Sequence, residues 1–309
     1  MSESEPWLVG IDVGATGARA RAIGPETTFE ALGAGAVARG DGAADAVRGV
    51  LATLLRQSPV GPITGVAVGS TGLGTLANKL DRLKQDIGTM AGTETVVLAA
   101  DPVTSHVGAL GGKPGVTIAA GTGAIVLGEA EDGRLVRVDG WGHLLGDRGS
   151  AAWIGRHGLR DALRAHDGRD AAGRQLLAAA RARFGAPETW PSAVYGRDDR
   201  AAILGSFAPD VSRLADHDDP AAAQILAEAV RALTESAVAA LSAPGVPPVV
   251  TMTGGVLRSA RTARLIRRSI PEAVEVRQAV GTSLDGAIEL ARRAATGRRG
   301  SDHPGLITW

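Results

Sequence analysis

Apolar residues recur along the chain with two different spacings, which predict a series of strands and helices. Residues 8–13 are mostly apolar, and residues 18–22 alternate alanine with arginine beyond a glycine-rich turn. Alternation with a period of two beside such a turn predicts a β-hairpin. Helical spacing follows over 43–57, and buried strands are predicted at 64–69 and 96–100. Strands that alternate with helices indicate an α/β domain with a mixed sheet. The other elements expected in this region are a third strand within 26–38 and a helix over 76–91.

The pattern of the first hairpin returns later in the chain. Residues 116–120 are apolar and lead through a Gly-Thr-Gly turn into a second apolar strand, 125–127. This repetition is a weak internal duplication and predicts a second α/β unit. Residues 150–240 are mostly helical in pattern, and a short buried strand is predicted at 249–252. The last predicted helices span 257–269 and 283–296.

Composition narrows the class of protein. The 309 residues are 44% hydrophobic, which is enough for one large or two medium domains with a sizeable core. The 33 basic and 33 acidic residues give no net charge, which argues against nucleic-acid and membrane-surface partners. The absence of cysteine excludes disulfides, iron–sulfur clusters and thiol catalysis. No signal peptide and no apolar run near the ~20 residues of a membrane span is visible, so we expect a cytoplasmic protein.

The turn of the first hairpin has the features of a phosphate-binding loop. Gly14 and Gly17 let backbone N–H groups approach an anion, and the Thr16 hydroxyl can join them. Asp12 ends a buried strand, where an unpartnered carboxylate is costly, so a cation is its expected partner. An ordinary hairpin with a glycine-rich turn is the alternative interpretation, because a motif this short also occurs by chance.

Three further motifs follow at distances that favour a nucleotide site. Asp101 ends a buried strand in the loop that joins the two halves of the chain, where one carboxylate could act as a base. The turn at 121–123 repeats the first turn, and a Thr-Gly-Gly turn lies at 253–255. Phosphoryl transfer needs positioning and charge neutralisation more than covalent catalysis, and these residues could provide both.

The order of these motifs resembles the sugar kinase, Hsp70 and actin superfamily. The longest match is the block over residues 140–155, which begins Gly-Trp-Gly-His-Leu-Leu-Gly-Asp. It looks like the segment that follows the second phosphate turn in N-acetylglucosamine kinases of the BadF/BadG type. The resemblance covers essentially the whole chain, and this block is its specific part.

The resemblance implies a role for each motif residue. ATP would bind with its phosphates on the two glycine turns, Asp12 would hold Mg²⁺ through water, and Asp101 would be the catalytic base on the 6-hydroxyl of an amino sugar. Gly140, Trp141 and Asp147 would contact that sugar. The sugar would be N-acetylglucosamine or glucosamine, and the enzyme a homodimer, as is common in the family. The residues expected at the phosphates and the adenosine are Gly14, Ala15, Thr16, Gly17, Gly121, Thr122, Gly123, Gly254 and Gly255.

The implied fold is α/β, with two ribonuclease H-like domains of the sugar kinase/Hsp70/actin type and a cleft between them. We expect the first domain to span residues 1–105 and the second 106–285. The helix within 286–309 is expected to pack back on the first domain. Closure over the sugar would exclude water from the reaction.

Three of these residues also have simpler structural interpretations. Asp101 precedes Pro102, and its role could be no more than to initiate a turn. Trp141 could be a core residue, since tryptophan is usually well buried. Asp147 could be no more than the N-cap of the following helix, although capping and sugar binding can coexist.

The sequence departs from the family at positions that contact the sugar. An asparagine usually follows the glycine-rich run after the third strand, where this chain has Arg39. Polar residues often follow the second phosphate turn, where Ala124 and Ile125 stand here. These departures concern the sugar and not the phosphate chemistry, so N-acetylmuramic acid or another hexose stays an alternative substrate.

Two other functions are compatible with the same fold. ATPase activators of radical dehydratases hold an iron–sulfur cluster through cysteines, and this chain has none. A non-catalytic, nucleotide-dependent sensor is the other alternative, but a sensor needs the phosphate turns and not the base. The presence of Asp101 therefore favours a kinase.

Overall fold

The structure is a computed structural model that describes residues 6–14, 17–36, 42–58, 60–71 and 79–309. Its contacts divide the chain into two compact units. The first unit comprises Met1–Gly115, Glu129–Leu135 and Gln278–Trp309, and the second comprises Val116–Gly128 and Val136–Arg277. The domain limits that the sequence suggests, at residues 105 and 285, remain predictions.

The first unit is built on a six-stranded mixed sheet with the order β11-β5-β4-β1-β2-β3. Its strands are β1 (Trp7–Val13), β2 (Ala18–Ile23), β3 (Thr28–Gly33), β4 (Ile63–Ser70), β5 (Val96–Ala100) and β11 (Ile307–Thr308). Strands β1, β4 and β5 are parallel, whereas β2 pairs antiparallel with both β1 and β3. The predicted hairpin is therefore β1–β2, and the third strand, β3, lies within the expected range 26–38.

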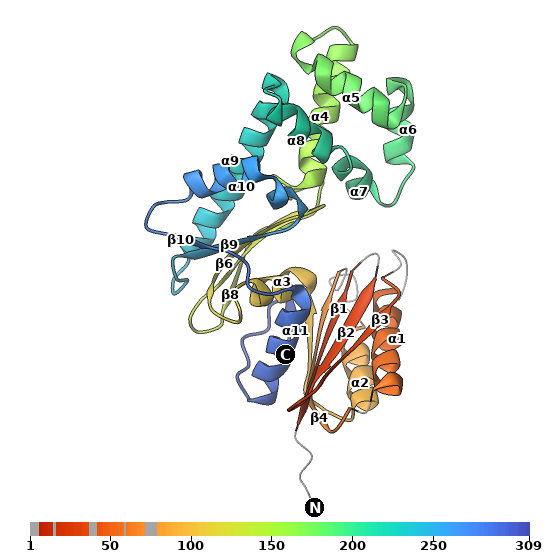
Figure 1. The fold of residues 1–309 in the computed structure, drawn as a ribbon, viewed down its shortest axis with the longest axis vertical. Coiled ribbons are helices and arrows are strands. Elements are labelled where there is room, and N and C mark those ends of the chain that lie inside the picture. Colours follow the sequence, from red (N-terminus) through yellow and green to blue (C-terminus); the bar gives the residue numbers. More distant parts are fainter. Residues whose placement is uncertain (1–5, 15–16, 37–41, 59, 72–78) are drawn as a thin grey trace, which may run out of the picture. The chain divides into compact units, whose positions relative to one another are not determined.

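Helices cover both faces of this sheet (Figure 1). They are α1 (Gly42–Gln57), α2 (Leu80–Ala91), α3 (Asp101–Ala109) and α11 (Ser283–Ala295). Apolar side chains of α1 and α2 join those of the strands in one core. On the other face, α11 lies so close that a Cβ on Gly10 would be 2.9 Å from Ile288 and one on Gly65 would be 2.7 Å from the Ala291 carbonyl oxygen. Because Gly10 on β1 and Gly65 on β4 have no Cβ, α11 can pack directly on these strands.

The second unit contains a five-stranded sheet with the order β10-β9-β6-β7-β8. Its strands are β6 (Gly115–Ala120), β7 (Ala124–Glu129), β8 (Leu135–Asp139), β9 (Val249–Thr253) and β10 (Glu275–Arg277). Strand β9 is parallel to both β6 and β10. Two helices, α9 (Pro220–Leu241) and α10 (Ala260–Ser269), supply apolar residues to the core that they share with the strands.

The helical part of the second unit has a core of its own, centred on the fully buried Phe207. Its helices are α4 (Ala151–His166), α5 (Arg174–Phe184), α6 (Trp190–Tyr195), α7 (Arg200–Gly205) and α8 (Ala208–Asp216). Within the described ranges, no helix is both long enough and apolar enough to cross a membrane.

Candidate phosphate and sugar site

Two carboxylates lie at one edge of the first sheet. Because β1, β4 and β5 are parallel, their carboxyl ends meet at the same edge. Asp12 is the next-to-last residue of β1, and Asp101 directly follows β5 as the first residue of α3. Burial raises the pKa of Asp101 to about 6, and the nearby charge of Asp12 adds to the rise. A carboxyl group tuned toward neutrality in this way is typical of a general base.

Asp12 has a basic partner on the neighbouring strand. Its Oδ2 accepts a hydrogen bond from Arg19 Nη2 at 2.9 Å, because the two residues face each other in the β1–β2 register. Among the described residues no group of three or more acidic, histidine or cysteine side chains could hold a metal. A magnesium ion that keeps most of its water needs only one or two carboxylates, so the donor set at Asp12 fits the ion.

The first glycine turn closes the β1–β2 hairpin. Gly14 N–H donates to the Gly17 carbonyl at 2.9 Å, and the Gly14 carbonyl accepts from Ala36 N–H at 2.9 Å. Ala15 and Thr16, which the sequence places at the phosphates, lie outside the described residues.

The second glycine turn uses a similar hydrogen bond in the second unit. Gly121 N–H donates to the Gly123 carbonyl at 2.9 Å. The carbonyls of Gly121 and Thr122 accept from Ala151 and Ala152 at 2.9 and 3.1 Å, which seats the turn on the first residues of α4. The positive end of a helix dipole therefore lies beside the turn, which favours an anion there.

The third glycine turn lies next to the second. A Cβ on Gly254 would be 2.3 Å from the Ala120 carbonyl oxygen, and its φ of +105° also favours glycine. Since β6 and β9 are parallel, with Ala119 opposite Thr253, both turns leave the same edge of the sheet. Gly255 has open space on its Cβ side. The structure thus brings together the second-unit residues expected at the nucleotide.

The predicted sugar segment is a compact loop held by carboxylates. Asp147 Oδ1 accepts from Gly142 N–H at 2.9 Å, and Asp139 accepts from the backbone N–H groups of Asp147 and Arg148 at 2.8 and 2.9 Å. Burial raises the pKa of Asp147; the Gly142 hydrogen bond opposes this rise, and the charge of Asp139 adds to it. A Cβ on Gly123 would lie 2.6 Å from Asp147 Oδ2, so the second glycine turn and Asp147 are in direct contact.

Trp141 lies on the surface of this loop and not in the core. Its side chain is 62% exposed, and the Arg137 guanidinium stacks over its ring at 4.0 Å. Arg137 also donates to the carbonyls of Asp139 and Gly140. An exposed aromatic face held by a cation is available for a sugar ring, and the interpretation of Trp141 as a core residue is wrong.

The structure also corrects the N-cap interpretation of Asp147. Ser150 is the N-cap of α4, since its hydroxyl accepts from Trp153 N–H at 3.1 Å. Among the departures from the family, Ile125 is buried against Gly140, and Arg39 lies outside the described residues.

Sequence reasoning missed two residues that shape the loop, Arg137 and Asp139. Both lie on β8 immediately before the glycine-tryptophan block, and their alternation with apolar residues is typical of any half-buried strand. A φ of +59° at Asp139 and of +54° at Asp147 marks the loop as unusual, but only coordinates reveal it.

Taken together, two α/β units with a glycine turn in each define the fold shared by actin, Hsp70 and sugar kinases. A ROK hexokinase from Thermus thermophilus shares this fold, with a TM-score of 0.57 at 18% identity over 95% of this chain and 100% of that one. The chain belongs to the BadF/BadG/BcrA/BcrD ATPase family, whose sequence profile matches residues 9–290.

Individual relatives are distant. The structure of a candidate N-acetylglucosamine kinase from Chromobacterium violaceum is 27% identical, with a TM-score of 0.72 over 93% of this chain and 99% of that one. One from Porphyromonas gingivalis is 18% identical, with a TM-score of 0.67 over 94% and 99%. An N-acetylmuramic acid/N-acetylglucosamine kinase from Clostridium acetobutylicum is 28% identical over 108 residues. That match spans about a third of each chain, 34% in both cases.

Proposed function

We propose that the protein is an ATP-dependent kinase that phosphorylates the 6-hydroxyl of an amino sugar, N-acetylglucosamine or glucosamine. The observation that carries the proposal is Asp101, a buried carboxyl at the start of a helix whose pKa is raised to about 6. A nucleotide clamp without chemistry needs no such group. The names of the relatives from Chromobacterium, Porphyromonas and Clostridium support an amino sugar as the substrate.

In the proposed reaction, the sugar 6-oxygen attacks the γ-phosphorus of ATP. Asp101 takes the hydroxyl proton, the bond to the β-phosphate oxygen breaks, and ADP leaves. The glycine turns at 14–17 and 121–123 bind the phosphates through backbone N–H groups, and Gly254 and Gly255 lie along the adenosine. Asp12 would hold Mg²⁺, which supplies charge neutralisation at the phosphates when it is bound.

The sugar is assigned to the loop around Asp147. Trp141 offers its exposed face to the ring, while Asp147 and the Gly140 backbone offer acceptors to hydroxyl groups. The proposal requires this loop and Asp101 to reach one sugar molecule, although they belong to different units. A cytoplasmic location, expected from the sequence, and a homodimer, implied by the resemblance, are also part of the proposal.

An ADP-release assay with ATP and Mg²⁺ tests the function across N-acetylglucosamine, glucosamine, N-acetylmuramic acid and glucose. We expect turnover with at least one of the first two, and phosphorus NMR of the product should place the phosphate on the 6-oxygen. Turnover with N-acetylmuramic acid or glucose alone would support a kinase and correct its substrate. ATP binding without turnover on any sugar would contradict a kinase and favour a nucleotide-dependent sensor.

Substitution of the base separates chemistry from binding. Asp101→Asn should lower kcat by about 10²–10⁴-fold, the usual contribution of a general base, and leave ATP affinity unchanged by calorimetry. Asp81→Asn is the matched control, because Asp81 is an exposed aspartate in the first turn of α2. An Asp101→Asn variant with wild-type turnover would remove Asp101 as the base.

A further inference from the structure

Helices α3 and α11 approach each other closely in the first unit. A Cβ on Gly108 would lie 1.9 Å from the Thr282 carbonyl oxygen, and one on Gly286 would lie 1.9 Å from the Thr104 carbonyl oxygen. The hydroxyls of Ser105 and Ser283 are 2.8 Å apart. The helix that begins with Asp101 is thus packed backbone to backbone on α11.

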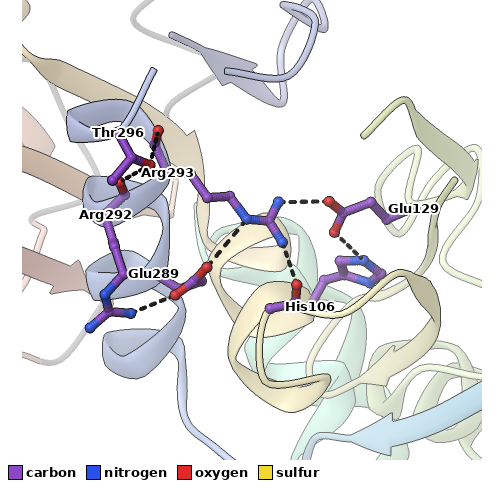
Figure 2. Close-up of polar contacts among 7 residues, drawn as sticks. His106, Glu129, Glu289, Arg292, Arg293 and Thr296 are labelled. Carbon is purple, nitrogen blue, oxygen red and sulfur yellow. Dashed lines mark hydrogen bonds and ion pairs between the residues drawn. The ribbon is translucent and has the colours of Figure 1, made fainter. Parts of the chain in front are cut away.

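A buried charge network lies where these two helices meet the end of β7 (Figure 2). Glu129 Oε1 accepts from Arg293 Nη1 at 2.6 Å, and its Oε2 lies 3.4 Å from His106 Nε2. Arg293 Nη2 donates to the Gly112 carbonyl, just beyond α3, at 2.9 Å. The exposed fractions are 0% for His106, 4% for Glu129 and 9% for Arg293. Glu129, at the end of β7, therefore contacts side chains from both α3 and α11, and all three side chains are buried.

Glu289 is a second acidic neighbour of Arg293. Glu289 Oε1 lies 3.6 Å from Arg293 Nε, and its Oε2 accepts from Arg292 Nη1 at 2.5 Å. Burial on its own would raise the pKa of Glu129, but the polar contact with His106 and the charge of Arg293 outweigh it and lower the pKa. Glu129 is therefore held as a carboxylate, and removing one partner of such a buried pair leaves the other charge uncompensated.

The position of Glu129 along the chain gives this network a role beyond packing. It is the last residue of β7, whose first residue, Ala124, directly follows the second phosphate turn. The chain passes from the second unit into the first between Gly128 and Glu129. His106 lies on α3, the helix that begins with Asp101. Glu129, the residue at which the chain enters the first unit, therefore contacts side chains of α3 and α11 within that unit.

We propose that Glu129 is a positioning residue that fixes the far end of β7 on α3 and α11. Through its contacts with His106 and Arg293, it fixes the point at which the chain leaves β7 and enters the first unit on the helix that begins with Asp101. Apolar side chains could bury the same surface, but their contacts are not directional. Ion pairs and hydrogen bonds restrain the distance and orientation of the two groups that they join. The effect on turnover rests on the proposed kinase function, but the anchoring itself does not.

The first test is the isosteric variant Glu129→Gln, with Arg292→Gln as the matched control. Arg292 is the sequence neighbour of Arg293, but its side chain is 50% exposed and pairs only with Glu289 among the described acids. In Glu129→Gln we expect faster amide exchange over 124–139 and 110–113 and unchanged exchange in α8. We also expect kcat to fall about 10–100-fold, as for a small misplacement of reacting groups, with unchanged KM for sugar and ATP. The control should behave as wild type in both measurements.

A second variant separates positioning from stability. The double substitution Glu129→Gln with Arg293→Met removes both buried charges, so thermal stability should recover relative to Glu129→Gln. Because the anchor is still absent, kcat should stay low at a temperature well below both melting transitions. Recovery of kcat together with stability would show that the network only stabilises the fold, and would overturn the proposal.

The two proposals fail in different ways. If wild-type protein turns over no sugar, the kinase function is wrong, and exchange over 124–139 alone decides the anchoring. Wild-type exchange in that segment of Glu129→Gln would overturn the inference, whatever the kinetics of the wild-type protein.

Discussion

At the scale of single residues, the surroundings of Asp101 decide what it can do. An exposed aspartate is a weak base near pH 7, because its pKa lies far below the pH of the cell. Burial at the start of α3 and, to a smaller extent, the charge of Asp12 together raise the pKa of Asp101 to about 6. The carboxylate is still mostly ionised at pH 7 but is a stronger proton acceptor than in water.

This pKa predicts an acid limb in the activity of the proposed kinase. Since the protonated carboxyl cannot accept the hydroxyl proton, kcat/KM for the sugar should fall about tenfold per pH unit below a pH of about 6, the pKa of Asp101 in the ligand-free protein. The measurement is kcat/KM for the sugar from pH 5 to 8, with controls for reversible inactivation at each pH. A flat profile down to pH 5 would contradict Asp101 as a base with this pKa.

At the scale of elements, the loop between β8 and α4 is ordered by its own carboxylates. Asp139 and Asp147 both have positive φ, and each accepts backbone N–H groups of the loop. Arg156 on α4 adds a hydrogen bond to the His143 carbonyl at 3.1 Å. The loop is therefore pre-organised before any ligand arrives, which reduces the entropy lost on binding.

Asp139→Asn tests this pre-organisation. Asparagine tolerates positive φ, but its NH₂ group replaces one of the two carboxylate oxygens that accept from the backbone N–H groups of Asp147 and Arg148. Loss of a charge-assisted hydrogen bond, worth about 1.5–3 kcal/mol, should raise KM for the sugar about tenfold or more and leave KM for ATP unchanged. Asp132→Asn, in the exposed turn of the β7–β8 hairpin, is the control. An equal effect of both variants would mean that the loop is ordered by other contacts.

At the scale of the whole molecule, residues distant in sequence complete the first unit. Strand β11 pairs antiparallel with β5, and the Leu306 carbonyl accepts from Ala100 N–H at 2.7 Å, directly before Asp101. The buried Leu306 and Ile307 thus extend the sheet that carries the candidate base.

Leu306→Ala should therefore destabilise the first unit. Deletion of a buried leucine side chain costs about 2–5 kcal/mol, which urea unfolding followed by tryptophan fluorescence can measure. Leu145→Ala is the matched control, because Leu145 is 87% exposed and its truncation leaves no cavity. Equal midpoints for wild type and Leu306→Ala would mean that β11 is not part of the cooperative fold.

Much of the architecture could be predicted because its causes are local. The β1–β2 hairpin, the buried parallel strands and the glycine turns follow from the residues within each segment, since side-chain periodicity and glycine conformation act over a few positions. Strand β3, Thr28–Gly33, likewise lies within the range 26–38 predicted for it. The close approach of Gly286 to α3, by contrast, is visible only in the structure.

What the sequence by itself determined is the family, the order of its elements and which residues could bind phosphate. Only the tertiary structure decided the protonation chemistry of Asp101, the exposure of Trp141 and the pairing of Glu129 with His106 and Arg293. These properties depend on burial and on charges contributed by segments up to 164 residues apart in the chain. Periodicity describes one segment at a time, whereas desolvation and Coulomb interactions depend on what folding brings beside it.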